Sequence, residues 1–502
     1  MQTLKTVEKT ILERVQATLS QQMMNLDAAQ ADFCQRYPQF ETTRKLDALR
    51  QSDYRRLDDR QHIYLDYTGG GLYSASQVMD HQQMLLDDVY GNPHSSNPTS
   101  LAATELNDRA RDYVMQYFNA SADDYIVIFT SNASGGLRIV GESYPFEQDG
   151  QYLLTFDNHN SVNGIREFAT RCDAPVHYVP VTPPALRIDG DRLRQQLQAA
   201  IPAGNNLFAF PAQSNFSGTQ HALDWIDIAH EHGWDVLVDC AAFAPTNRLD
   251  LSQIKPDFVP LSFYKMFGYP TGLGALFIHR RVLPKLRRPW FAGGTITIAS
   301  VQGNVHYLEE GSAAFEDGTI NYLDIPAVEI GLRHMESIGI DVIHERVVAL
   351  TGYLLDEMMT LRHDNDQPLV HIYGDTANVD RGGTISFNLF DPEGRCLDYE
   401  VIETLANAVN ISLRTGCFCN PGAGESALSI TYDEIAGCLS GVDRISFNEF
   451  VQVMTANTDH DAVGAIRVSV GLVTSISDVY AFVQFLSAFL NVPADAVIFA
   501  EN

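Results

Sequence analysis

The sequence has few basic residues. Among its 502 residues, 34 lysines and arginines stand against 63 aspartates and glutamates, so the formal net charge is -29 at pH 7. A chain this acidic is a poor ligand for nucleic acid or for an anionic membrane, and we expect it to bind neither. A small anionic ligand is still possible, because backbone amides and a few local cations can form a site whatever the net charge.

Long apolar runs and closely spaced cysteines are also scarce. No stretch approaches the roughly 18 apolar residues of a membrane span, and the N-terminus lacks the apolar run of a signal peptide. Seven scattered cysteines are too few for a disulfide framework in a chain of this length, so we expect most of them to be reduced thiols. We therefore predict a cytoplasmic protein without a membrane anchor.

What is present is typical of a globular protein with two domains. Hydrophobic residues make up 45% of the chain and charged residues 19%. Residues 1 to about 60 show apolar residues at helical spacing and predict a helical segment whose role is packing. From about Tyr125, short apolar strands alternate with helices, which predicts an α/β domain. A long helix at about 325–338 would lead from it into a smaller C-terminal domain.

One stretch, residues 262–272, centres on a single lysine among aromatic side chains. Lys265 follows Tyr264 and is followed by glycines and a proline, which predicts a lysine on a tight turn at the edge of a sheet. Apolar surroundings lower the pKa of a lysine and make the neutral amine available for Schiff-base chemistry. The commonest partner for such a lysine is pyridoxal 5'-phosphate (PLP). Taken alone, the stretch fits a surface lysine in a turn equally well.

Polar residues follow several of the predicted strands. His159, Asn215 and Asp239 each come after an apolar run, and we expect them to converge on one crevice at the carboxyl ends of a parallel sheet. Asp239 could pair with the protonated pyridine nitrogen of PLP. His159 could stack on the ring and carry a proton. Taken singly, the aspartate also fits a helix cap, and the histidine a core residue.

Small hydroxyl residues and glycines follow the predicted strand at 126–129. The series Thr-Ser-Asn-Ala-Ser-Gly-Gly at 130–136 would precede a helix that opens at Leu137. Free amides and the helix dipole at such a place favour a phosphate group. Ordinary N-capping by Ser131 or Ser134 explains the same pattern.

A close pair of cysteines lies near the C-terminus. Cys417 and Cys419 are flanked by glycines and Pro421, which predicts a loop able to carry a thiol to a substrate. Arg414 close by would favour the thiolate, the reactive form. Two cysteines one residue apart, with no second close pair, have poor spacing for zinc, so metal binding is the weaker alternative. A pair of buried structural thiols is another.

Together these motifs resemble those of the fold-type I PLP enzymes of the aminotransferase class V family. The resemblance is to the cysteine desulfurases, and in particular to the N-terminal, desulfurase-like domain of the molybdenum cofactor sulfurases. It runs from about residue 60 to 490. The stretches that carry it are residues 64–66, 91–95, 262–272 and 414–423.

The resemblance implies a fold and a domain arrangement. The expected fold is α/β, with a large domain around a mainly parallel seven-stranded sheet and a smaller α+β C-terminal domain. Residues 61–325 would form the large PLP-binding domain, and residues 326–502 the small domain with the cysteine loop. Residues 1–60 would form a helical segment packed on the small domain.

The resemblance also assigns roles by position. Lys265 is implied as the Schiff-base lysine, Asp239 as the partner of the pyridine nitrogen and His159 as the residue stacked on the ring. Cys419 is implied as the cysteine that forms a persulfide. The other implied positions are Asn215 near the phenolic oxygen of PLP, Ala133, Ser134 and Ser262 at its phosphate, Thr295 reaching the phosphate of the neighbouring subunit, and Arg467 with Arg414 at the substrate.

The implied activity is that of a cysteine desulfurase. Such an enzyme takes sulfur from L-cysteine as an enzyme persulfide, releases alanine and passes the sulfur to an acceptor protein or cofactor. A homodimer is expected, because fold-type I sites borrow residues across an interface. One alternative is another class V enzyme, a C–S lyase or an aminotransferase acting on a different amino acid. The other is a non-catalytic sulfur carrier or scaffold, which would need neither Lys265 nor Asp239.

Some positions depart from the family pattern. Tyr264 replaces the histidine that most desulfurases place before the lysine, and Ala242 stands where many have glutamine. Gly424 stands where the sulfurases often carry a third cysteine. In a sequence of 502 residues we also expect no room for the C-terminal domain with which those sulfurases bind the molybdenum cofactor. The sequence therefore leaves the sulfur acceptor and the role of Cys417 open.

Overall fold

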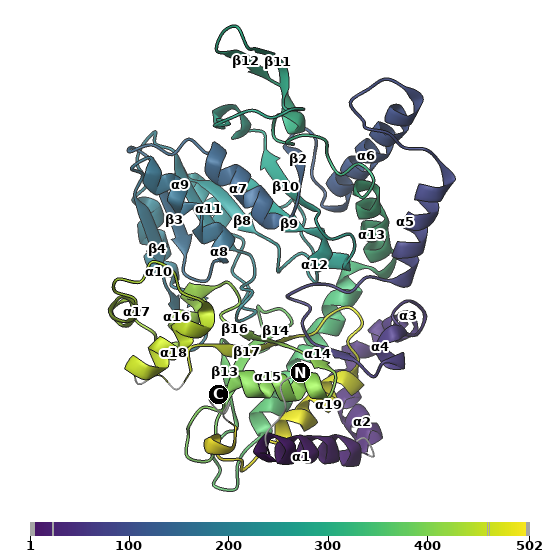
Figure 1. Ribbon diagram of the computed structural model, residues 1–502, viewed down its shortest axis with the longest axis vertical. Helices are drawn as coiled ribbons and strands as arrows, with labels where there is room; N and C mark the ends of the chain where they lie inside the picture. The colour runs from purple at the N-terminus through teal and green to yellow at the C-terminus, as the bar shows by residue number, and fades with distance from the viewer. Residues whose placement is uncertain (1–5, 23–24, 459, 461, 498–502) are drawn as a thin grey trace.

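The computed structural model describes residues 6–22, 25–458, 460 and 462–497. Figure 1 shows an upper lobe around a seven-stranded sheet and a lower lobe around a four-stranded sheet. Helix α13 (Ile325–Ile338) runs beside the large sheet, and α14 (Ile340–Thr360) continues from it into the lower lobe. The predicted helix at 325–338 is therefore confirmed.

The large sheet is mainly parallel. In their order across the sheet, its strands are β2 (Tyr125–Thr130), β10 (Gly274–His279), β9 (Phe258–Ser262), β8 (Asp235–Asp239), β7 (Asn206–Pro211), β3 (Gln151–Thr155) and β4 (Val176–Val179). Strand β10 pairs antiparallel with β2 and β9, and the other neighbouring strands pair in parallel. The predicted α/β fold with a mainly parallel seven-stranded sheet is confirmed.

Helices cover both faces of this sheet. They are α6 (Pro98–Tyr117), α7 (Ala133–Ser143), α8 (Asn160–Asn163), α9 (Arg166–Arg171), α10 (Gly190–Gln198), α11 (Trp225–Glu231), α12 (Phe263–Phe267) and α13, and α5 (Ala75–Asp87) packs against α13. In β2, Val127 and Phe129 pack into one core with α6 and α13, while Ile126 and Ile128 pack into another with α7. Successive strand residues point to opposite faces, so a sheet covered on both sides needs a continuous apolar run.

The lower lobe is built on an antiparallel sheet. Its strands, in order, are β13 (Val370–Tyr373), β14 (Thr384–Leu389), β17 (Ala465–Ser469) and β16 (Arg414–Gly416). Its helices are α14, α15 (Tyr399–Ala408), α16 (Pro421–Leu428), α17 (Tyr432–Cys438), α18 (Phe447–Asn457) and α19 (Ile476–Ser487). Three two-stranded pairs complete the strands: β1 (Ile63–Tyr64) with β15 (Ile411–Ser412), β5 (Val181–Thr182) with β6 (Arg187–Ile188), and β11 (Ile296–Ser300) with β12 (Val305–Leu308).

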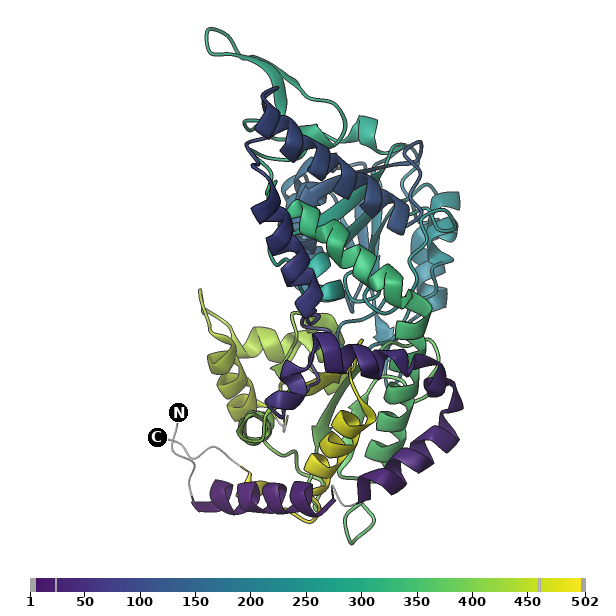
Figure 2. The ribbon, with the colours of Figure 1, turned by 90° about the vertical axis from the view of Figure 1, so that its right-hand side faces the viewer.

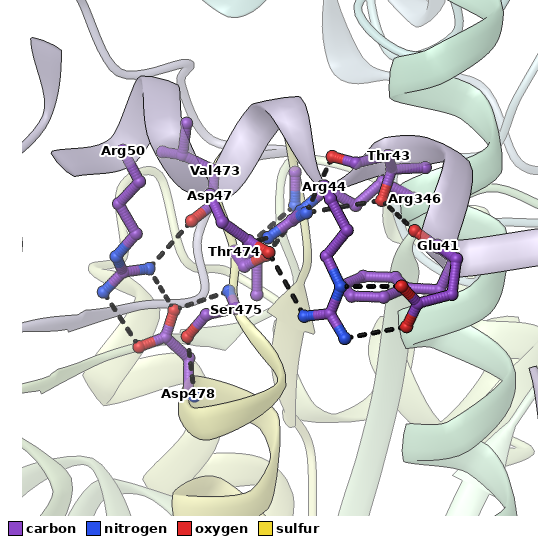
Figure 3. A network of polar contacts seen from close by, with 12 residues as sticks. Glu41, Thr43, Arg44, Asp47, Arg50, Arg346, Val473, Thr474, Ser475 and Asp478 are labelled. Atoms are coloured by element: carbon purple, nitrogen blue, oxygen red, sulfur yellow. Dashed lines mark hydrogen bonds and ion pairs between the residues drawn. The ribbon is translucent and has the colours of Figure 1, made fainter. Parts of the chain in front are cut away.

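The N-terminal helices lie along the lower lobe (Figure 2). They are α1 (Thr6–Gln22), α2 (Leu26–Arg36), η2 (Pro38–Thr43), α3 (Lys45–Asp53) and α4 (Arg56–Asp59), and they contact α14, α15 and α19. Polar contacts join these helices to α14 and to the segment at 473–478 (Figure 3). Arg346 of α14 is fully buried and donates to the Thr474 carbonyl and the Asp47 carboxylate. Arg50 of α3 donates to the Val473 carbonyl and pairs with Asp478 at the start of α19.

The helix after β2 begins earlier than the sequence predicts. Helix α7 starts at Ala133 rather than at Leu137, and its cap is Asn132 rather than Ser131 or Ser134. The Asn132 side chain accepts a hydrogen bond from the Gly135 amide at 2.9 Å. The two glycines therefore belong to the first turn of the helix, whereas their presence in the sequence favoured a loop.

None of the helices that the structure describes combines the length and the apolar content needed to cross a bilayer. The longest of them, α14, carries acidic and basic residues along its length, with Asp341, Glu345 and Arg346 in its first two turns. Its buried face packs instead against the N-terminal helices and α19.

Candidate active site

A pocket lies at the carboxyl ends of the parallel strands. The predicted residues that line it are Ala133, Ser134, His159, Asn215, Asp239, Ser262 and Lys265. They come from the start of α7, from the last residues of β8 and β9, and from the segments that follow β3, β7 and β9. The expectation that His159, Asn215 and Asp239 converge on one crevice is confirmed. The physical reason is that the carboxyl ends of parallel strands meet at the same edge of the sheet.

Lys265 stands in the short helix α12, directly after β9. Burial lowers the pKa of its amine, and the nearby Asp239 carboxylate opposes this shift. Gly268 ends the helix with a φ of 78°, and a Cβ there would lie 2.3 Å from the Tyr73 nitrogen. The turn that presents the lysine therefore requires glycine at this position. An amine with a lowered pKa is available as a base and as a nucleophile.

Asp239 and His159 face the same pocket. One carboxylate oxygen of Asp239, Oδ1, accepts a hydrogen bond from the Ala241 amide at 3.0 Å. The Ser161 amide donates to Nδ1 of His159 at 3.1 Å, which places the proton of the neutral ring on Nε2. Burial lowers the pKa of His159, with Asp239 opposing the shift. The site thus holds a neutral ring beside a carboxylate.

Donors cluster where α7 begins. The Ala133 amide donates to the Ser262 hydroxyl at 2.9 Å, and the hydroxyls of Ser134 and Ser161 lie 2.6 Å apart. Amides and hydroxyls at a helix N-terminus suit a phosphate group. Ser161, in the first turn of the helix that His159 caps, was not among the predicted residues. With a lysine, a carboxylate and a flat ring alongside, these residues fit PLP.

Two arginines and an aspartate form a second cluster. Arg414 and Arg467 are cross-strand neighbours on β16 and β17. Both donate to Asp66, at 2.7 Å from Nη2 of Arg414 and 3.0 Å from Nη2 of Arg467. Arg467 is almost fully buried, and its Nε has no partner among the residues that the structure describes. This role of Asp66 was not predicted, because in the sequence Asp66 stands out only as part of the motif at 64–66.

The cysteine loop is bonded to the pocket. The Asn160 amide donates to the Cys419 carbonyl at 2.7 Å, and Nδ2 of Asn215 donates to the Phe418 carbonyl at 2.8 Å. The Phe418 ring lies 4.7 Å from the Arg467 guanidinium. Cys419 is exposed, whereas Cys417 is half-buried and burial raises the pKa of its thiol. The structure therefore places Cys419 next to the pocket but outside its buried part.

Two predicted residues have surroundings that differ from those expected. The side chain of Asn215 makes hydrogen bonds with the cysteine loop, and Arg414 makes its hydrogen bonds with Asp66. Their predicted roles at the phenolic oxygen of PLP and beside the thiolate stay predictions.

Thr295 does not line this pocket. Its hydroxyl donates to the Ala292 carbonyl and accepts from the Ala292 amide, both at 2.9 Å, in the turn before the hairpin β11–β12. That hairpin projects from the upper lobe (Figures 1 and 2), and Ile298, Val305 and Tyr307 on it are exposed. A role for Thr295 at a neighbouring subunit stays a prediction.

The model of the family described as aminotransferase class-V matches residues 63–482. The chain belongs to the aminotransferase class V family. The match includes all the residues that line the pocket and both cysteines of the loop. The protein is therefore a PLP-dependent enzyme, as predicted.

Individual relatives and structures support the same assignment. The molybdenum cofactor sulfurase of Solanum lycopersicum is 33% identical to this class V enzyme over 502 residues, covering 93% of this chain and 60% of its own. That of Bos taurus is 36% identical over 475 residues, covering 88% and 52%. The chain thus spans only about half to three fifths of these relatives. The cysteine desulfurase of Thermococcus onnurineus has the same fold, with a TM-score of 0.69, 22% identity and coverage of 87% and 96%.

Proposed function

We propose that this class V enzyme is a cysteine desulfurase, which takes sulfur from L-cysteine as a persulfide on Cys419 and releases alanine. The observation that carries the proposal is the bonding of the Cys419 loop to the pocket, through the Asn160 amide and the Asn215 side chain. A transaminase needs no thiol at this place. A scaffold needs neither a buried lysine nor a carboxylate at the end of a strand.

PLP would be held by the residues that line the pocket. Lys265 would attach it, Asp239 would pair with its ring nitrogen and His159 would lie against the ring. The Ala133 amide and the hydroxyls of Ser134 and Ser262 would bind its phosphate. When bound, PLP draws electrons away from the α-carbon of an amino acid.

The protein groups would move the protons and hold the substrate. Arg467 would bind the substrate carboxylate with its planar guanidinium, exchanging part of its contact with Asp66. Burial lowers the pKa of the Lys265 amine, so this amine is the base that removes the α proton. With the proton on Nε2, the His159 ring would donate on its pocket side while Ser161 holds Nδ1.

Cys419 would then act as the nucleophile. Its thiolate attacks the substrate sulfur, a sulfur–sulfur bond forms, and the carbon–sulfur bond breaks. The electron pair of the broken bond returns to the substrate carbon, which takes up a proton and gives alanine. The persulfide sulfur would leave for an acceptor, a protein or a cofactor. We also propose a homodimer, supported by the exposed apolar residues of the β11–β12 hairpin.

The test compares the purified protein with three variants. We expect an absorption band near the edge of the visible range that is absent in Lys265→Ala, and alanine with sulfide from L-cysteine plus a reductant. Cys419→Ala should lose alanine formation. Cys172→Ala, which removes another exposed thiol, should keep it. Alanine formation by Cys419→Ala at the wild-type rate would sink the persulfide mechanism, and pyruvate with ammonia in place of alanine would identify a lyase.

A further inference from the structure

Asn420 is a fully buried residue at the junction of the cysteine loop and the pocket. Its Nδ2 donates to the Asp157 carbonyl at 2.8 Å and to Oδ1 of Asn215 at 2.9 Å. Its Oδ1 accepts from the Ala423 amide at 3.2 Å and so caps α16. One side chain therefore joins the cysteine loop to the segments that follow β3 and β7.

The backbone of the cysteine loop has a conformation that needs support from outside. Phe418 and Cys419 have φ angles of 56° and 55°, in the left-handed region that residues with a side chain rarely adopt. Both carbonyls are bound by groups from other segments, that of Phe418 by the Asn215 side chain and that of Cys419 by the Asn160 amide. Together with the Asn420 amide, which donates to the Cys417 carbonyl at 3.0 Å, these two contacts hold the backbone at Cys419.

Asn420 sets the orientation of one of these contacts. Because its Nδ2 donates to Oδ1 of Asn215, the other end of the Asn215 amide, Nδ2, points to the Phe418 carbonyl. An amide flipped the other way would place two donors together at Asn420 and two acceptors together at Phe418. The hydrogen bond from Asn215 to the Phe418 carbonyl therefore depends on the hydrogen bond from Asn420 to Asn215.

On the basis of the proposed desulfurase function, we propose that Asn420 is a positioning residue for sulfur transfer. It orients the Asn215 amide and so holds Cys419 at the mouth of the pocket. It acts through Asn215 and the Asp157 carbonyl rather than by touching the substrate. The competing structural role is that of an N-cap alone, which needs only the acceptor Oδ1.

Two substitutions of Asn420 separate these roles. Asn420→Asp keeps an acceptor for the Ala423 amide but cannot donate to Asp157 or Asn215. Asn420→Ala loses all three hydrogen bonds. Thr431→Ala is the matched control, because Thr431 caps the next helix, α17, and bonds there with Glu434.

Hydrogen exchange of the holoenzyme, followed by mass spectrometry, reports the loop directly. We expect peptides that cover 157–163 and 417–424 to exchange about tenfold faster in both Asn420 variants, which is the effect of losing ~1.4 kcal/mol of local stability. Peptides from β8 should exchange as in the wild type, which shows that the fold is intact. Thr431→Ala should leave the loop peptides unchanged.

Single-turnover kinetics tests the functional part. Both Asn420 variants should form alanine from L-cysteine about tenfold more slowly, while KM stays within about threefold because Arg467 is unchanged. If Asn420→Asp matches the wild type in exchange and rate, Asn420 is only a cap and the proposal is wrong. A single-turnover rate at the wild-type level despite a loosened loop would also overturn it. If the wild type makes no alanine, the desulfurase function fails, and the exchange data alone show whether Asn420 holds the loop.

Discussion

At the scale of single residues, the Asp66 carboxylate compensates the charges of two neighbouring guanidinium groups. It is the carboxylate that both Arg414 and Arg467 contact, and Arg467 is almost fully buried. Removing one partner of a buried pair leaves a charge without compensation. We expect Asp66→Asn to lower the free energy of unfolding by about 3 kcal/mol, measured from thermal and denaturant unfolding. Arg414→Gln, which removes the half-exposed partner, should cost under about 1 kcal/mol; equal effects of the two changes would contradict this view.

His159 should give the stability a measurable pH dependence. Burial lowers its pKa from the usual 6.5, so below pH 6.5 the unfolded chain takes up a proton that the folded protein does not. Stability therefore falls as the pH falls from 6.5 to the lowered pKa of the folded state. Unfolding midpoints at pH 7.5 and 5.0 should differ more for the wild type than for His159→Gln, in which the other titrating groups are retained. The same pH dependence in both proteins would show that His159 is not desolvated.

Which residues form the site was easier to predict from the sequence than which residues contact each other. Lys265, Asp239 and His159 follow local patterns, an apolar strand or an aromatic turn, and the structure brings them to one pocket. Asp66 and Arg467 contact each other across 401 positions of sequence. No local pattern indicates such a pair, and the same holds for Asn420 with Asp157.

At the scale of elements, the first turn of α7 connects helix stability with phosphate binding. Asn132 caps this turn, and the Ala133 amide next to it lies in the predicted phosphate site. Loss of an N-cap costs roughly 0.5–2 kcal/mol. We expect Asn132→Ala to lower the melting temperature and to weaken PLP binding at least several-fold, measured by titrating the PLP-free protein with PLP. Ser446→Ala, which uncaps α18, should leave PLP affinity unchanged; equal affinities for both variants would show that the cap does not support the site.

The boundaries of elements were predictable where local and tertiary preferences agree. Helix α13 begins and ends at the predicted positions, about 325 and 338. Helix α7 begins at Ala133, four residues before the predicted Leu137. The predicted start was too late because Gly135 and Gly136 favour a loop in isolation. In the fold, Gly136 lies so close to the sheet that a Cβ would be 3.2 Å from the Cβ of Leu276. Packing of α7 on β9 and β10 outweighs the low helix propensity of glycine.

At the scale of the whole molecule, the alternation of strands and helices predicted the α/β lobe and its parallel sheet. The expected position of the N-terminal helices came from the family resemblance, because their apolar spacing indicates a buried face but not the surface that covers it. The structure places them against α14 and α19, and Tyr54, between α3 and α4, lines a hollow that Lys265 also lines. The N-terminal segment thus contributes to the surroundings of the lysine.

The contacts of Arg346 should hold this segment in place. Its side chain is fully buried and joins α14 to the Thr474 carbonyl and to Asp47 of the N-terminal helices. Arg346→Ala removes the donor to the Thr474 carbonyl and leaves Asp47 with only its longer contact to Arg44, and we expect a loss of about 3 kcal/mol in the free energy of unfolding. In limited proteolysis, the variant should be cleaved first within residues 25–60, faster than the wild type. Arg248→Ala, which breaks an exposed ion pair with Asp341, should behave as the wild type. If Arg346→Ala resists proteolysis as well as Arg248→Ala does, apolar packing alone holds the N-terminal helices. The hydrogen bonds of the buried arginine would then compensate only its own burial.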